Sequence, residues 1–212
     1  DRFESRGLGD VYKRQFCAGA NIRMLAGAEH AHKVNFCKFT NETRNAMEAA
    51  EADSGQKYIA AVRGACAGGG YELALACNHI MLVEDGSSTV ALPEVPLLAV
   101  LPGTGGLTRL TDKRQVRRDL CDVFCAMEEG VRGQRALDWR LVDEIVPNSK
   151  FDETVAALAA EFAAASSGHS EKGIELTPLC RDVSDDGSVS YSTVEVAICL
   201  LYTSDAADEV DG

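Results

Sequence analysis

The sequence predicts an α/β fold in which helices cover a sheet. Short apolar runs of strand length alternate along the chain with longer segments of helical periodicity, which is the pattern of such folds. Of the 212 residues, 46% are hydrophobic and 25% are charged, a composition typical of globular proteins. No run approaches the roughly 20 apolar residues needed to span a bilayer, so no membrane partner is expected.

The first predicted elements lie between residues 16 and 53. Residues 16–25 form a short apolar stretch with a glycine turn. A helix is predicted over residues 32–53, because apolar and small residues recur there at steps of three and four and would form one core-facing stripe. The stripe comprises Phe36, Phe39, Thr43, Ala46 and Ala50.

The body of the chain continues the alternation. Strands are predicted in apolar runs bounded by turn residues, and helices in longer periodic segments. The predicted strands are residues 57–62, 79–84 and 88–92; helices are expected over 71–77, after the turn at 102–106, and over 114–127 and 151–166, with a helix and then a strand in 132–147.

Four segments are expected along the chain. Residues 16–167 carry the regular alternation and form one domain, whereas residues 168–198 form a linker and the start of a following region, with strand-like alternation at 191–198. Residues 1–15 and 199–212 resemble translated sequencing-adapter sequence, as in RGLGDVYKRQ and CLLYTSDAADE, and are expected to be non-native. The fold is therefore expected to be truncated at its N-terminus.

Charge and cysteine content exclude several classes of function. The formal net charge of −12 argues against nucleic acid or an anionic membrane as a partner. The eight cysteines include no C-x-x-C pair and the chain has four histidines, so no metal site is expected. The mostly apolar neighbours of the cysteines favour free, buried thiols in a reducing compartment, and a cytoplasmic protein is expected.

The motif ACAGGGYELALAC at 65–77 places three glycines between a predicted strand and a predicted helix. Without Cβ atoms, Gly68, Gly69 and Gly70 would leave the free N–H groups of the helix N-terminus accessible to a ligand. The loop therefore suits an anion or a developing oxyanion. A tight strand-to-helix turn without a ligand is the alternative, and a phosphate loop is disfavoured because neither glycine-rich nucleotide motif is present.

A second loop and a pair of glutamates complete the candidate site. FCAGANIRML at 16–25 has small residues at a turn, so its N–H groups could join the glycine loop in an oxyanion hole for a thioester carbonyl. Glu94 stands between Pro93 and Pro96, which restrict the backbone, and Glu72 lies one helix and two strands earlier. Two carboxyl groups in one pocket can share acid and base roles. Taken singly, each glutamate is better explained as a helix-terminal or solvated charge.

These motifs, in this order and spacing, resemble the crotonase (enoyl-CoA hydratase/isomerase) superfamily. The resemblance covers residues 16–147 through FCAGANIRML, AAVRGACAGGGYELALACNHIMLV, LPEVPLLAVLPGTGGLTRL and RALDWRLVDEIVP. It implies a crotonase-like spiral of ββα units that binds acyl-CoA thioesters, with coenzyme A as part of the substrate and no separate cofactor. It also implies a homo-oligomer for a full-length protein.

The resemblance assigns roles to individual residues. It implies oxyanion N–H groups at Ala20 and Gly69 and an acid/base pair at Glu72 and Glu94. It implies that Cys37 borders the pocket, with a role in proton transfer or positioning; by helical periodicity Cys37 lies off the stripe given above, and a spectator thiol is the alternative. The implied substrate-binding residues are Ala18, Ala20, Asn21, Ile22, Arg23 and Gly68.

Further motifs resemble a ring-opening branch of this superfamily. KVNFCKFTNETRN, LPGTGGLTRLTDKRQVRRDLCDVFC and EEGVRGQRALDWRLVDE fit that branch better than the ordinary hydratases. The resemblance implies hydrolytic ring opening of an epoxidised aromatic acyl-CoA, with carbon–carbon cleavage, by an enzyme of which this chain is one part. The alternatives are a plain enoyl-CoA hydratase or isomerase, and a fragment that binds CoA without turnover.

Overall fold

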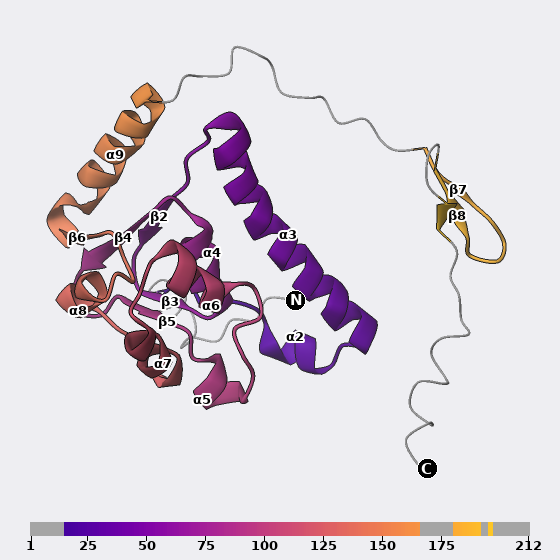
Figure 1. The fold of residues 1–212 in the computed structure, drawn as a ribbon, viewed down its shortest axis with the longest axis horizontal. Coiled ribbons are helices and arrows are strands. Elements are labelled where there is room, and N and C mark those ends of the chain that lie inside the picture. Colours follow the sequence, from indigo (N-terminus) through magenta and orange to yellow (C-terminus); the bar gives the residue numbers. More distant parts are fainter. Residues whose placement is uncertain (1–14, 166–179, 192–194, 197–212) are drawn as a thin grey trace, which may run out of the picture. The chain divides into compact units, whose positions relative to one another are not determined.

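The computed structural model describes residues 15–165, 180–191 and 195–196, and the chain divides into two compact units, residues 1–169 and 170–212 (Figure 1). The terminal segments that were expected to be non-native lie outside the described residues, except for Gln15, which begins the first strand. No described helix is long and apolar enough to cross a bilayer.

Two small parallel sheets form the centre of the first unit. One has the order β1-β3-β5 and the other β2-β4-β6, and every pairing within them is parallel. The chain adds one strand to each sheet and then forms a helix, as in β2-β3-α4 and β4-β5-α5. A ββα unit is therefore repeated along the chain. The strands are β1 Gln15–Cys17, β2 Ile59–Val62, β3 Ala65–Ala67, β4 His79–Glu84, β5 Thr89–Ala91 and β6 Glu144–Pro147. The α/β class and the ββα repeat are confirmed.

Helices surround these sheets, with the long α3 running past α4 (Figure 1). The helices are α2 Ile22–Ala26, α3 His30–Ser54, α4 Gly69–Ala76, α5 Glu94–Leu98, α6 Gly106–Thr108, the π-helix Arg109–Lys113, α7 Arg118–Ala126, α8 Gly133–Asp138, the 3-10 helix Asn148–Lys150 and α9 Phe151–Ala165.

The central strand β4 is buried on both of its faces. Its successive side chains point to opposite sides: Ile80 packs in the main core with Tyr71 of α4, and Met81 packs in a second cluster with Phe151 of α9. The Tyr71 hydroxyl donates a hydrogen bond to the Leu141 carbonyl at 2.7 Å, so the buried end of this ring is satisfied. The core therefore fixes α4, and with it the glycine loop at its start.

The predicted core-facing stripe of α3 is wrong. Phe39 is 68% exposed, and Arg44 is only 7% exposed, so the buried face lies beside the predicted one. The physical reason is that α3 covers the polar backbone of the glycine loop, to which Arg44 donates a hydrogen bond. Other elements also differ from expectation. Strand β3 and the short helices α2 and α5 were not predicted, and α7 begins at Arg118 because Gln115 has a φ of 55° and interrupts the helix.

The second unit is a small antiparallel sheet of β7 Asp182–Val183, β8 Val189–Ser190 and β9 Glu195–Val196. Gly187, with a φ of 83°, lies in the turn between β7 and β8. Strand β9 falls within the strand-like segment that was predicted at residues 191–198.

Candidate active site at the glycine loop

The glycine loop is held closely against β1 and α5. A Cβ atom on Gly70 would lie 2.2 Å from the Cys17 carbonyl oxygen, so only glycine fits this approach of two backbones. Gly68 has a φ of 55°, and a Cβ atom there would lie 2.9 Å from Glu94 Oε1. The missing side chains therefore allow both β1 and the Glu94 carboxyl to reach the loop.

The two predicted oxyanion donors border the same small space. A Cβ atom on Gly19 would lie 2.8 Å from the Gly69 nitrogen, and one on Gly69 would lie 3.9 Å from the Ala20 nitrogen. Among the described residues, neither the Ala20 nor the Gly69 N–H donates a hydrogen bond to another group. Two unused backbone donors at one point can receive one oxygen atom that carries developing negative charge.

The Glu72 carboxylate is buried at the start of α4, and both of its oxygens accept hydrogen bonds. Its side chain is 2% exposed. Oε1 accepts hydrogen bonds from the N–H groups of Thr104 at 2.9 Å and Gly106 at 3.0 Å, and Oε2 accepts one from the Thr104 hydroxyl. A Cβ atom on Gly106 would lie 2.9 Å from Glu72 Cγ, which leaves no room for a larger residue. The loop 103–106 thus fixes the rotamer of Glu72.

Glu94 differs from Glu72 because it lacks such support. It begins the short helix α5, and its Oε2 is buried with no hydrogen-bond partner among the described residues. Burial raises the pKa of the Glu94 carboxyl, and the nearby Glu72 carboxylate acts in the same direction. Two carboxyl groups of one site therefore have different environments, which is the condition for separate acid and base roles.

The raised pKa of Glu94 predicts how stability depends on pH. The folded state binds this proton more tightly than the unfolded chain, so the stability that Glu94 contributes is present at low pH and is lost as the pH rises through its raised pKa. Relative to the unsubstituted chain, Glu94→Gln is expected to gain stability as the pH is raised from about 4 to about 8. Urea unfolding at a series of pH values measures this difference. The exposed Glu128→Gln is the control, and equal pH dependence in all three proteins would contradict the prediction.

The remaining predicted residues lie on the exposed side of the site. Asn21 caps α2, since its Oδ1 accepts a hydrogen bond from the Met24 N–H at 3.2 Å. The same segment carries three exposed residues beside the space that the two N–H donors border, here called the two-donor space: Ala18, Ile22 and Arg23. Gly68 lies between this segment and Glu94.

Cys37 is exposed on α3. Its carbonyl accepts a hydrogen bond from Asn41 Nδ2, which also donates to the Gly103 carbonyl at the start of the loop that holds Glu72. Within the described part of the chain, no hydrogen bond joins the Cys37 thiol to either glutamate. Asn41 thus connects the helix turn that contains Cys37 to the loop that holds Glu72. The proposed role of the Cys37 thiol stays a prediction.

Sequence reasoning missed three residues of this site. Thr104 and Gly106 stood in a segment interpreted only as a turn that opens a helix, although they provide the donors to Glu72. Arg44 was missed because the wrong face of α3 was chosen. In the structure it lies on the helix face of the half-buried Phe36 and Thr40, which precede it at steps of four.

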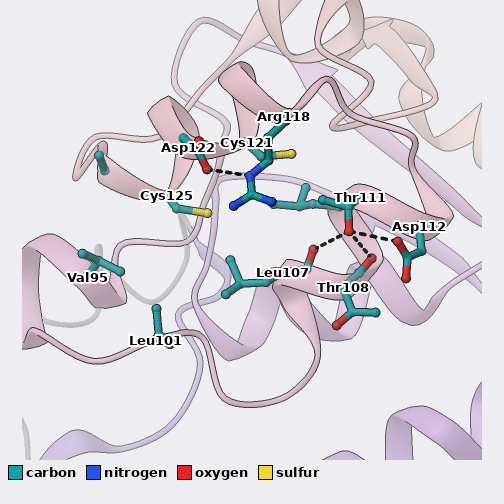
Figure 2. Close-up of a pocket in the computed structure, with 12 residues that line it drawn as sticks. Val95, Leu101, Leu107, Thr108, Thr111, Asp112, Arg118, Cys121, Asp122 and Cys125 are labelled. Carbon is teal, nitrogen blue, oxygen red and sulfur yellow. Dashed lines mark hydrogen bonds and ion pairs between the residues drawn. The ribbon is translucent and has the colours of Figure 1, made fainter.

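A cavity of about 550 Å³ lies beside the site, between α5, α6 and α7 (Figure 2). It adjoins the site through Val95, which follows Glu94, and Leu107, which follows Gly106. Figure 2 shows Arg118 and Asp122 paired across one wall, with an N–O distance of 3.1 Å. Neither glutamate and neither oxyanion donor lines this cavity, so it is a neighbour of the site.

The described cysteines have no bonds to one another, and no group of three His, Cys, Asp or Glu side chains within the described ranges is arranged to hold a metal. Burial raises the pKa of Cys66, and it raises that of Cys125 to about 11, so both thiols are protonated near neutral pH. The expectation that the cysteines are buried is wrong for Cys37 and Cys180, which are exposed.

Comparison with known proteins agrees with this geometry. The sequence model of the enoyl-CoA hydratase/isomerase family matches residues 8–177. The chain belongs to the enoyl-CoA hydratase/isomerase family. It is 58% identical over 184 residues to a benzoyl-CoA-dihydrodiol lyase from Aromatoleum evansii, covering 86% of this chain and 33% of that protein. It is 35% identical over 178 residues to a fatty acid oxidation complex subunit alpha from Shewanella loihica, covering 81% and 24% of the two chains.

Solved structures of this family have the same fold. An enoyl-CoA hydratase from Geobacillus kaustophilus superposes with a TM-score of 0.63 at 35% identity, covering 71% of this chain and 56% of that one. One from Bacillus anthracis gives a TM-score of 0.59 at 31% identity, covering 70% and 54%. The chain thus spans about half the length of these family members and a third or less of the curated relatives.

Proposed function

We propose that the chain forms the acyl-CoA-binding and catalytic part of a lyase that opens the ring of 2,3-epoxybenzoyl-CoA in aerobic benzoate degradation. One observation supports the proposal: two unused backbone N–H groups border one space at the glycine loop, the Glu94 carboxyl group reaches the same loop, and the buried Glu72 carboxyl group lies on the helix that the loop begins. The 58% identity to a benzoyl-CoA-dihydrodiol lyase supports an aromatic substrate over a simple enoyl-CoA.

In this proposal the two N–H groups hold the thioester oxygen. The oxygen accepts hydrogen bonds from the Ala20 and Gly69 N–H groups, and these bonds strengthen as negative charge develops on it in the enolate. Loss of one such donor typically costs about 2.7–4 kcal/mol of transition-state stabilisation. The exposed segment 18–23 then lies where the CoA part of the substrate leaves the site, and Arg23 offers a positive charge to its phosphates.

The two glutamates divide the proton transfers between them. Glu72 accepts three hydrogen bonds that hold its carboxyl group in one orientation, and it is the base that activates water. Glu94 has a raised pKa and one unpartnered oxygen, which suits the acid that returns the proton. The overall reaction consumes two water molecules and releases formate and an unsaturated aldehyde thioester, so the atoms balance without an added oxidant or cofactor.

A direct assay tests the proposal. The 212-residue chain is incubated with 2,3-epoxybenzoyl-CoA and formate is measured, with crotonyl-CoA hydration followed in parallel. We expect formate release that is strongly reduced in Glu72→Gln and in Glu94→Gln. The absence of formate release, with or without hydration of crotonyl-CoA, would contradict the proposed ring opening.

Hydration of an enoyl-CoA is the second candidate function, and the enoyl-CoA hydratases among the solved family members favour it. Turnover of crotonyl-CoA without formate release would select it. Binding of benzoyl-CoA without turnover of either substrate would instead indicate a CoA-binding part. Calorimetric titration measures that binding, and Gly69→Pro, which removes the N–H group, is expected to weaken it.

A further inference from the structure

Arg44 is an unusual feature of the site because its charge is buried without an ion pair. The side chain is 7% exposed, and no carboxylate among the described residues lies within ion-pair distance of it. Its Nη1 donates to the Thr40 carbonyl at 2.9 Å and its Nη2 to the Gly69 carbonyl at 2.6 Å, while Nε is buried without a partner. Burying an unpaired cation is costly, so a purely structural role would be served better by a neutral donor.

The guanidinium borders the same space as the two oxyanion donors. A Cβ atom on Gly69 would lie 3.7 Å from Arg44 Nη2 and 3.9 Å from the Ala20 nitrogen, so one point lies within 4 Å of both. The hydrogen bond to the Gly69 carbonyl also fixes the peptide that follows the Gly69 N–H. Arg44 therefore contacts the residue that provides one donor and lies near the space that the two donors border.

The charges around this space need a cation. The Glu72 carboxyl group belongs to the site, Glu94 is its proposed acid, and the proposed reaction adds a negative charge on the thioester oxygen. Burial lowers the pKa of the Arg44 guanidinium, whereas Glu72 acts against this shift, Arg109 adds to it and Cys17 of β1 acts against it. Arg109 is paired with Glu48 at 2.8 Å, which leaves Arg44 as the unpaired cation at this point of the described structure.

We propose that Arg44 is a positioning residue, which holds the Gly69 peptide and supplies the positive charge that offsets the enolate oxyanion. This inference rests on the proposed function, since it assumes an acyl-CoA enolate in the two-donor space. A cation about 4–6 Å from a developing anion lowers the pKa for its formation by about 1–3 units. The proposed role depends on both the charge of Arg44 and its hydrogen bonds, and different substitutions of Arg44 test the two contributions separately.

Acetoacetyl-CoA provides the test, because its enolate absorbs in the near ultraviolet and its keto form does not. The absorbance of the bound ligand is titrated against pH in the 212-residue chain and in two variants. Arg44→Gln keeps a donor to the Gly69 carbonyl but removes the charge, and it is expected to raise the apparent pKa of the bound ligand by about 1–3 units. Arg44→Lys keeps the charge and is expected to retain most of the enolate.

Arg114→Gln is the matched control. Arg114 is also largely buried, but it pairs with Asp143 at 2.7 Å away from the site, so its loss is expected to lower the melting temperature without moving the ligand pKa. An unchanged ligand pKa in Arg44→Gln would overturn the role of Arg44 alone. If Arg44→Gln does not fold, loss of the enolate signal in folded Arg44→Lys would overturn it instead. Failure of the unsubstituted chain to bind acetoacetyl-CoA would overturn the proposed function together with this inference.

Discussion

Glu72→Gln is expected to lower turnover of the acyl-CoA substrate by about 10²- to 10⁴-fold while the protein remains folded. The amide has the shape of the carboxyl group, so its oxygen can still accept the two N–H bonds from Thr104 and Gly106. Its NH₂ group can donate a hydrogen bond to the Thr104 hydroxyl, because a hydroxyl can accept a hydrogen bond as well as donate one. The substitution thus removes the base and keeps the local structure.

Three measurements separate this effect from a structural one. Formate release or crotonyl-CoA hydration gives the rate, calorimetry with benzoyl-CoA gives the affinity, and thermal unfolding gives the stability. The affinity and the melting temperature are expected to change little. Glu128→Gln, at an exposed position, is the control for loss of one negative charge. Turnover by Glu72→Gln near that of the unsubstituted chain would exclude Glu72 as the base.

The sequence was sufficient to predict the fold class and the residues at the glycine loop. Strands β2 and β4 are apolar runs of strand length, and the three glycines mark a place where two backbones approach closely. These signals are local, because each depends on residues that are neighbours in sequence. The motifs of the family also have a fixed order, and the acid/base roles that they imply for Glu72 and Glu94 stay predictions.

The supporting residues could not be predicted in the same way. Whether Arg44 or Phe39 of α3 faces inward depends on what the helix covers, and that surface is the polar backbone of a loop 25 positions away. Apolar periodicity assumes an apolar partner and therefore selected the wrong face. Thr104 supports Glu72 across 32 positions, and only the folded path of the chain brings the two together.

Gly70→Ala is expected to destabilise the chain by about 3 kcal/mol or more, because the added methyl group has no room. Its carbon would lie 2.2 Å from the carbonyl oxygen and 2.7 Å from the carbonyl carbon of Cys17, and both are backbone atoms that cannot move aside without shifting β1. Urea unfolding measures the loss. Because β1 leads directly into the segment that contains Ala20, benzoyl-CoA binding is expected to be lost together with stability.

Two other glycines show that this effect is specific to the position. Gly27→Ala meets only the Arg23 carbonyl oxygen, at 3.8 Å, at a negative φ of −84°, so it is expected to be neutral or slightly stabilising. Gly69→Ala would make ordinary contacts of 3.5 Å or more, and its stability is expected to stay within about 1 kcal/mol of the unsubstituted chain.

The methyl group of Gly69→Ala would nevertheless occupy the space between Arg44 Nη2 and the Ala20 nitrogen, where the thioester oxygen is proposed to lie. Affinity for benzoyl-CoA is therefore expected to fall by about tenfold or more in a folded protein, which corresponds to about 1.4 kcal/mol. Adjacent glycines would then serve different purposes, with Gly70 needed for the packing of β1 and Gly69 needed for the ligand. Equal loss of stability in the two variants, or undiminished binding by Gly69→Ala, would contradict this division.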